Sequence, residues 1–248
     1  MSTILHIGPE PALLVGVVAL VASSLAAVTG FGGAAVLLPV LVFAFGVRDA
    51  VPILTVAQLV GNASRVWFNR RELDYRVVGW FALGAVPLAL VGGVIFSRAP
   101  LPTLTRLLGL LLLLTVAWRR LRPRVRIKPP LRAFALIGGG GSLLSALLGS
   151  VGPLMAPFFL AYGLVRGAYI GTEALSTVVM HLAKLVAYRG TAVLPTSSIV
   201  TGLAIAPIMV LGSWLGKRIV DRLPERIFVL LIEAVMTVAG LLFVVRGR

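Results

Sequence analysis

The hydrophobic pattern of this 248-residue chain consists of long apolar blocks separated by short polar or charged segments. A helix needs about 20 apolar residues to cross the hydrocarbon core of a bilayer, and the usual range is roughly 17–25. The blocks that approach this length lie at 11–29, 50–68, 77–97, 103–118, 133–148, 168–188, 196–216 and 227–245. The pattern therefore predicts an all-α polytopic membrane protein with about eight transmembrane helices.

Two further apolar pieces, 34–46 and 153–163, are too short to cross a bilayer. Each follows a glycine-rich break, which lies at 29–33 in the first case and at 149–152 in the second. These breaks predict a broken or re-entrant helix in each half of the chain.

The sequence contains an internal repeat of about 120 residues. Pro39 and Pro157, in the two short pieces, are 118 residues apart, and Pro87 and Pro207 are 120 apart. Similar spacings relate three further pairs: Ala50 with Ala168, Gly92 with Gly212, and Arg106 with Arg226. The spacing predicts two membrane repeats, 1–118 and 133–248.

The basic residues predict the orientation of the chain, because cytoplasmic loops of membrane proteins are enriched in Lys and Arg. The segment 119–132 joins the repeats and holds seven basic residues, so we expect it to be a cytoplasmic linker. If 133–163 enters and leaves on one side as a hairpin, fifteen basic residues lie inside, six outside and two within the membrane. A single crossing gives thirteen inside and eight outside. The hairpin is therefore preferred, and it makes the repeats inverted, as in many secondary transporters.

The composition narrows the class of function further. Apolar residues make up 59% of the chain and charged residues 12%, so cytoplasmic loops explain the net charge of +15 better than nucleic-acid binding does. There is no cysteine, and the first apolar block has no basic segment before it, so neither disulfides nor a cleaved signal peptide is expected. Motifs of metalloproteases, α/β-hydrolases and nucleotide-binding loops are missing. We therefore expect that the protein is not an enzyme and that it binds no metal or cofactor. We expect it to lie in the cell inner membrane.

The two glycine-rich breaks are the first candidates for a binding site. A helix that starts after such a break, at about Ala34 or Leu154, directs unpaired N–H groups and a positive dipole end at any cavity there. These groups would bind a small anion. The predicted contacts are Gly30, Phe31, Gly32, Gly33, Ser150 and Gly152. The alternative is that the glycines serve only close packing or a kink.

Polar stripes on the spans that follow the breaks are the second candidates. At 100° per residue they occupy one face of each span: Thr55, Gln58, Asn62 and Arg65 on the first, and Glu173, Ser176, Thr177, Met180, His181 and Lys184 on the second. Ionisable groups inside a membrane are costly and usually face a cavity or each other. We expect these and one neighbouring residue to contact the substrate: Gln58, Asn62, Arg65, Thr172, Ser176, His181 and Lys184. The candidates for proton coupling are Glu173, His181 and Glu233.

A second interpretation of the charged residues stays open. Lys184 and Glu173 are eleven positions apart on one helix, about three turns, so they are too distant to pair. In this second interpretation, Arg65 and Lys184 snorkel to opposite interfaces of the membrane, and Glu173 lies at a membrane edge. His181 is equally compatible with a satisfied buried histidine.

Three stretches of the chain resemble the TauE/SafE sulfite-exporter family. Residues 29–39, Thr-Gly-Phe-Gly-Gly-Ala-Ala-Val-Leu-Leu-Pro, resemble its glycine-rich opening, and 69–76 is similar to its short loop after the second segment. The region 149–157, together with Gly171-Thr172-Glu173, resembles its second repeat, although Ser-Val-Gly-Pro stands where a richer glycine run is usual. The resemblance covers nearly the whole chain. It implies export of sulfite or organosulfonates, whereas the residues themselves imply only a small anion.

The leading hypothesis is a secondary transporter that has a small anion and the lipid bilayer as its partners. The same helix starts would also serve an anion channel or a transporter of another small organic anion. An intramembrane enzyme lacks a catalytic constellation, and a scaffold without transport leaves the polar stripes unexplained. The pattern leaves the coupling ion, the direction of transport and the oligomeric state open.

Overall fold

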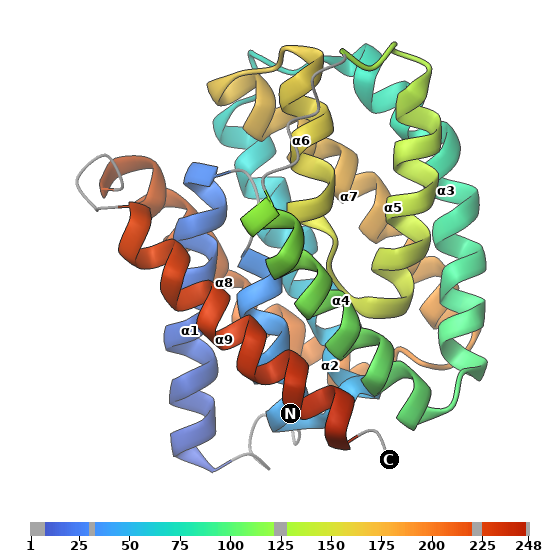
Figure 1. Ribbon diagram of the computed structural model, residues 1–248, viewed down its shortest axis with the longest axis vertical. Coiled ribbons are helices and arrows are strands. Elements are labelled where there is room, and N and C mark those ends of the chain that lie inside the picture. Colours follow the sequence, from blue (N-terminus) through green and yellow to red (C-terminus); the bar gives the residue numbers. More distant parts are fainter. Residues whose placement is uncertain (1–7, 30–32, 122–127, 220–224, 247–248) are drawn as a thin grey trace.

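The computed structural model describes residues 8–29, 33–121, 128–219 and 225–246, and the regular structure of these ranges is helical (Figure 1). The helices are α1 (Pro9–Thr29), α2 (Gly33–Phe68), α3 (Tyr75–Arg98), α4 (Leu101–Leu121), α5 (Ala133–Leu148), α6 (Gly152–Tyr162), α7 (Arg166–Gly190), α8 (Thr196–Ile219) and α9 (Glu225–Arg246). Within these ranges, α1, α2, α3, α7 and α8 are long and apolar enough to cross a membrane. The predicted all-α membrane class is confirmed, while the count of eight spans stays a prediction.

The second predicted break separates two helices, and the first falls between the described ends of α1 and α2. In the first half, α2 begins at Gly33, and residues 30–32 of that break lie outside the described part of the chain. In the second half, α5 ends at Leu148 and α6 begins at Gly152. Between them Gly149 has a φ of 86°, a conformation that glycine adopts at little cost. With 11 residues, α6 is too short to cross a bilayer.

The helix α2 consists of two helical segments that meet at Gly46. This residue has φ 75° and ψ 163°, which is not helical. The first segment is therefore the short apolar piece expected at 34–46, and the second contains the span expected at 50–68. Arg48, just after Gly46, donates hydrogen bonds to the carbonyls of Phe96, Ser97 and Ala99 at 2.7–3.0 Å. These bonds satisfy carbonyls that the end of α3 leaves without helical partners.

Glycines allow α3 and α5 to pack closely. A Cβ atom at Gly84 would overlap the backbone carbonyl of Ala135, and one at Gly138 would overlap that of Phe81. On the other side of the molecule, a Cβ at Gly216 of α8 would overlap the carbonyl of Ser24 in α1. The glycine run 138–141 is therefore part of a helix interface and is no flexible linker.

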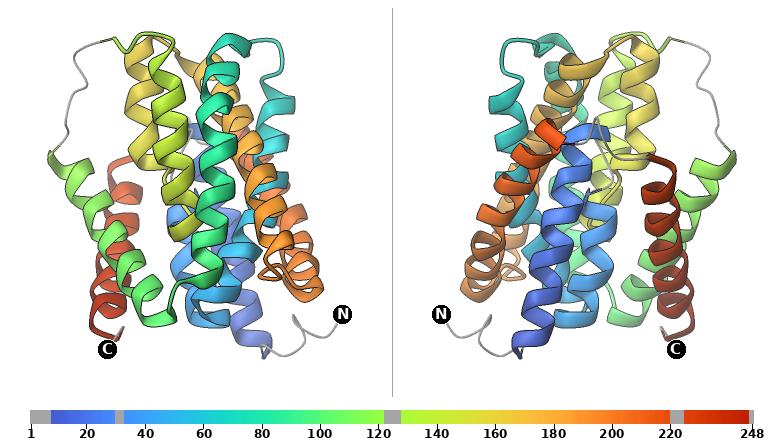
Figure 2. Two further views of the ribbon diagram at one scale, coloured as in Figure 1. Left: turned by 90° about the vertical axis from the view of Figure 1, so that its right-hand side faces the viewer. Right: turned by 90° about the vertical axis from the view of Figure 1, so that its left-hand side faces the viewer.

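The packing places α2 and α7 at the centre of the fold. Helix α3 packs against α5 and α7, α8 packs against α1 and α2, and α4 packs against α9. In Figure 2, α1 runs upward and α5 downward, while α3 runs downward and α8 upward. Among the candidate spans, α2 and α7 have the largest buried share, and both carry a predicted polar stripe.

Candidate functional site

A cavity of about 40 Å³ lies where the starts of α2 and α6 meet the middle of the fold. Its wall includes Gly33 and Ala34 at the start of α2, and Ser150, Val151 and Gly152 at the start of α6. A volume of this size accommodates roughly three water molecules or a small anion. The two predicted helix starts therefore line one common cavity.

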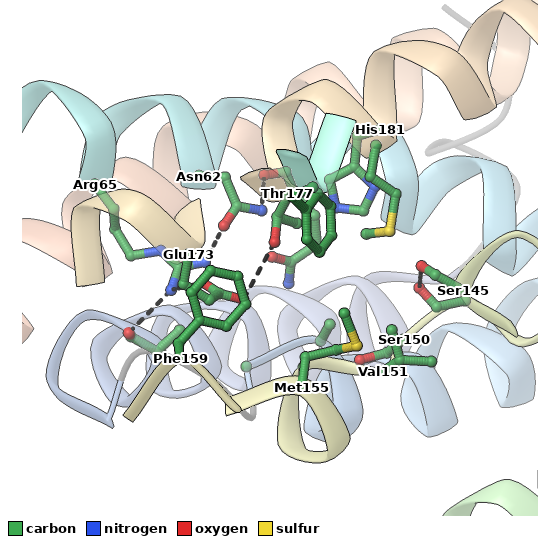
Figure 3. Close-up of a pocket in the computed structure, with 18 residues that line it drawn as sticks. Asn62, Arg65, Ser145, Ser150, Val151, Met155, Phe159, Glu173, Thr177 and His181 are labelled. Carbon is green, nitrogen blue, oxygen red and sulfur yellow. Dashed lines mark hydrogen bonds and ion pairs between the residues drawn. The ribbon is translucent and has the colours of Figure 1, made fainter. Parts of the chain in front are cut away.

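The polar stripes of α2 and α7 complete the cavity wall (Figure 3). Their lining residues are Gln58, Asn62 and Arg65 from α2, and Glu173, Thr177, Met180 and His181 from α7. The spacing of three and four residues that defined each stripe in the sequence places these side chains on one helix face.

Arg65 and Glu173 form an ion pair inside the protein. Arg65 Nη1 lies 3.7 Å from Glu173 Oε2, and both side chains are 6% exposed. The guanidinium also donates to the carbonyl of Ala26 at 3.1 Å and to Asn62 Oδ1, and Thr177 Oγ1 donates to Glu173 Oε1 at 3.1 Å. The alternative in which Arg65 snorkels to an interface is therefore wrong, while the position of Glu173 at a membrane edge stays a prediction.

Lys184 lies deeper and has a different environment. Its side chain is fully buried, and Nζ donates to Ser145 Oγ at 3.2 Å. Within the described residues, no carboxylate lies within ion-pair distance of Lys184. Snorkelling is thus wrong for Lys184 as well, and the expected lack of pairing with Glu173 is confirmed. Ser145 lines the cavity, so Lys184 Nζ lies directly behind this residue of the cavity wall.

Three polar side-chain atoms of the cavity wall have no hydrogen-bond partner in the described part of the chain. Glu173 Oε2 has its ion pair with Arg65, whereas Gln58 Nε2 and His181 Nδ1 have no partner, and both of these side chains are 3% exposed. A buried polar atom without a partner is costly, so it usually meets a water molecule or a ligand. The cavity therefore has unused hydrogen-bonding capacity on both α2 and α7.

Apolar side chains form another part of the wall. Phe81 comes from α3, and Met155 and Phe159 come from α6. These residues and Ser145 were missed in the sequence, because each lies within an apolar block and nothing in the block indicates which face meets the cavity. The one available signal for Ser145 was its spacing of three from Ser142 just before the second break.

Several predicted contact residues lie away from the cavity. Thr172 Oγ1 accepts a hydrogen bond from the backbone N–H of Asp74 at 2.9 Å, so Thr172 holds the loop between α2 and α3. Ser176 is buried but does not line the cavity. Gly33 does line it, yet a Cβ there would lie 2.5 Å from the carbonyl oxygen of Ala22 in α1, so packing also requires this glycine.

Four predicted residues cannot be placed at the cavity. Gly30, Phe31 and Gly32 lie outside the described residues, and so does the side chain of Glu233 in α9. Their roles stay predictions.

The comparisons with known proteins give one match. The family model described as sulfite exporter TauE/SafE matches residues 15–243. The searches of curated proteins and of solved structures found no match. The family consists of membrane transporters, not enzymes, and the matched range contains most of α1 and α9 and all helices between them. The chain therefore belongs to the TauE/SafE sulfite exporter family and is a transmembrane transport protein.

Proposed function

We propose that this protein is a secondary transporter, in the export direction, of small sulfur-containing anions such as sulfite and organosulfonates. The observation that carries the proposal is the position of Lys184, a fully buried lysine without a carboxylate partner in the described chain, directly behind a cavity at which two interrupted helices start. A buried charge needs a counter-charge or strong hydrogen bonds. An anion in the cavity would supply both.

The groups around the cavity can replace the water that an anion loses. The starts of α2 and α6 contribute partial positive charges of roughly +0.5 each. The amide of Gln58 and the imidazole of His181 supply additional hydrogen-bonding groups. The apolar side chains of Met155 and Phe159 suit the organic part of a sulfonate.

We further propose that transport occurs by alternating access between two inverted repeats in the inner membrane. Equivalent contacts in the two halves support this. Gly92 of α3 packs on Ala146 of α5, and Gly212 of α8, 120 residues later, packs on Ser23 of α1. In Figure 2, α1 and α5 run in opposite directions, as an inverted repeat requires of equivalent helices. Rocking of one repeat against the other would then open the cavity to each side in turn.

Proton coupling is proposed for Glu173 and His181, since both line the cavity that the anion would occupy. Glu233 remains a third candidate.

The test is transport by purified protein in proteoliposomes. We expect accumulation of radiolabelled sulfite against its gradient when an ion gradient is imposed. The variant Lys184→Gln should lose most of this transport, while Lys128→Gln, which removes an exposed lysine, should retain it. Equilibration without accumulation would favour the anion channel, and equal transport by Lys184→Gln would overturn the role of the buried lysine.

A further inference from the structure

We infer that Glu173 sets the charge of the anion that this transporter accepts: by pairing with Arg65, it leaves Lys184 as the uncompensated side-chain charge at the cavity, which favours monoanions over dianions. This inference rests on the proposed function and narrows its substrate class to singly charged species such as organosulfonates and bisulfite.

The first step is the charge balance of the described side chains at the cavity. The ionisable residues in its wall are Arg65, Glu173 and His181, and Lys184 lies directly behind Ser145. The charges of Arg65 and Glu173 cancel across 3.7 Å. His181 is buried without a counter-charge, which favours its neutral form. Once a bound anion supplies a counter-charge, the ammonium group of Lys184 carries the one positive side-chain charge that no carboxylate of the described cavity pairs with.

The second step is the separation of the two charged groups along α7. Glu173 and Lys184 are eleven residues apart, which corresponds to about 16 Å of helix. Glu173 therefore neutralises Arg65 and leaves Lys184 uncompensated. In the view of Figure 3, Phe159 overlaps the Arg65–Glu173 pair, and Met155 lies between this pair and Ser145. A sulfonate group near Ser145 and the start of α6 would place its organic group along this apolar wall.

The third step compares the two kinds of anion. The helix starts attract a monoanion and a dianion alike, so the difference depends on the full charges. A monoanion balances Lys184. A dianion brings a second negative charge into a buried cavity whose wall already contains the carboxylate of Glu173, and an uncompensated charge in such a site is costly.

The experiment uses methanesulfonate and sulfate, two tetrahedral anions of nearly equal size that carry one and two charges at about pH 8. Their dissociation constants are measured by calorimetry with the purified full-length protein in detergent. We expect the wild type to bind methanesulfonate at least about tenfold more tightly than sulfate. Glu173→Gln keeps the shape of the side chain and removes its charge, so the preference should shift towards sulfate by a similar factor.

Two further variants control for charge and folding. The double variant Arg65→Gln/Glu173→Gln restores the original charge balance without an unpaired buried guanidinium, so it should again prefer methanesulfonate. Glu10→Gln removes an exposed carboxylate at the start of α1 and should keep the wild-type preference.

Equal binding of both anions by the wild type, or a sulfate preference in the double variant, would overturn the inference and leave the transporter proposal intact. If Glu173→Gln does not fold, Arg65→Gln tests the same charge balance: it leaves the carboxylate of Glu173 without its counter-charge, so it should weaken the binding of both anions, and that of sulfate more. Failure of the wild type to bind any sulfonate, sulfite or sulfate would refute the proposed function itself.

Discussion

Arg65 and Glu173 depend on each other because both are buried at the centre of the fold. Removing two charges from water is expensive, and their mutual attraction offsets this only when the remaining hydrogen bonds are also made. Here Asn62, Thr177 and the carbonyl of Ala26 make three such bonds, while Glu173 Oε2 has its ion pair with Arg65 and no hydrogen bond in the described part of the chain. The pair joins α2 of the first half to α7 of the second.

This dependence predicts the stability of variants. Glu173→Ala should lower the free energy of unfolding by about 3–5 kcal/mol, because it leaves a buried guanidinium without its counter-charge. The double variant Arg65→Met/Glu173→Met should be more stable than Glu173→Ala. Thermal and denaturant unfolding in mild detergent would measure both. A complete double-mutant cycle compares the loss of unfolding free energy in each single variant of Arg65 and Glu173 with the loss in the double variant. If the two single losses added up to the loss in the double variant, the ion pair would contribute no coupling energy.

At the scale of residues, the sequence predicted part of the site. The helical spacing of polar residues identified Gln58, Asn62, Arg65, Glu173 and His181, all of which line the cavity. It did not indicate that Arg65 pairs with Glu173 rather than facing an anion, because that contact joins two helices about 108 residues apart in the sequence. Periodicity describes the faces of one helix and is silent about which faces of different helices meet.

The interface between α3 and α5 shows how small residues position whole helices. Lipid is as apolar as the helix surfaces, so close backbone packing contributes much of the helix association in a membrane. Of the four consecutive glycines in α5, Gly138 faces the carbonyl of Phe81, whereas an added Cβ at Gly140 meets nothing within 4 Å.

We expect alanine substitutions at these two glycines of one run to have opposite effects on stability. Gly138→Ala should push α3 and α5 apart and lower the melting temperature in detergent. Gly140→Ala should be neutral or stabilising by up to roughly 1 kcal/mol, because alanine has the higher helix propensity. Comparable destabilisation by both substitutions would mean that the run acts through backbone flexibility and not through the α3–α5 contact.

At the scale of elements, the apolar blocks predicted the helices well because the length and composition of a span are local properties. The limits of α3, α5 and α7 differ from the predicted spans by two residues or fewer at each end. The pattern alone could not show that the short piece 34–46 continues into the next span. That continuation depends on the backbone conformation of Gly46, and the sequence reveals only that glycine permits it.

At the scale of the whole molecule, the basic residues are distributed unevenly between its two ends. The described basic residues of the α2–α3 loop, Arg70 and Arg71, lie at the end of the molecule where α2 ends and α7 begins (Figure 2). Arg98 and Arg189 lie at the opposite end, at the ends of α3 and α7. If the first end is cytoplasmic, the distribution agrees with the enrichment of basic residues on that side.

Four exposed arginines form two matched pairs that test the inverted topology. Arg71 and Arg189 are 118 residues apart, and Arg98 and Arg218 are 120 apart, so the members of each pair occupy equivalent places in the two repeats. The chain has no native cysteine, which gives a clean background for single Cys substitutions at these positions. A membrane-impermeant thiol reagent added to intact cells should label Arg189→Cys and Arg98→Cys, and should label Arg71→Cys and Arg218→Cys only after the membrane is permeabilised.

The reason for this expectation is that an inverted repeat places equivalent positions on opposite sides of the membrane, whereas a parallel repeat places them on the same side. Labelling both members of a pair from outside, or neither, would therefore exclude the inverted arrangement. Reversed labelling of both pairs would keep the inversion and reverse the orientation of the protein. In that case the fifteen basic residues assigned to the cytoplasm would lie outside, against the usual distribution. The two arginines of each pair occupy equivalent positions in the two repeats. A difference in their labelling therefore shows that these positions lie on opposite sides of the membrane.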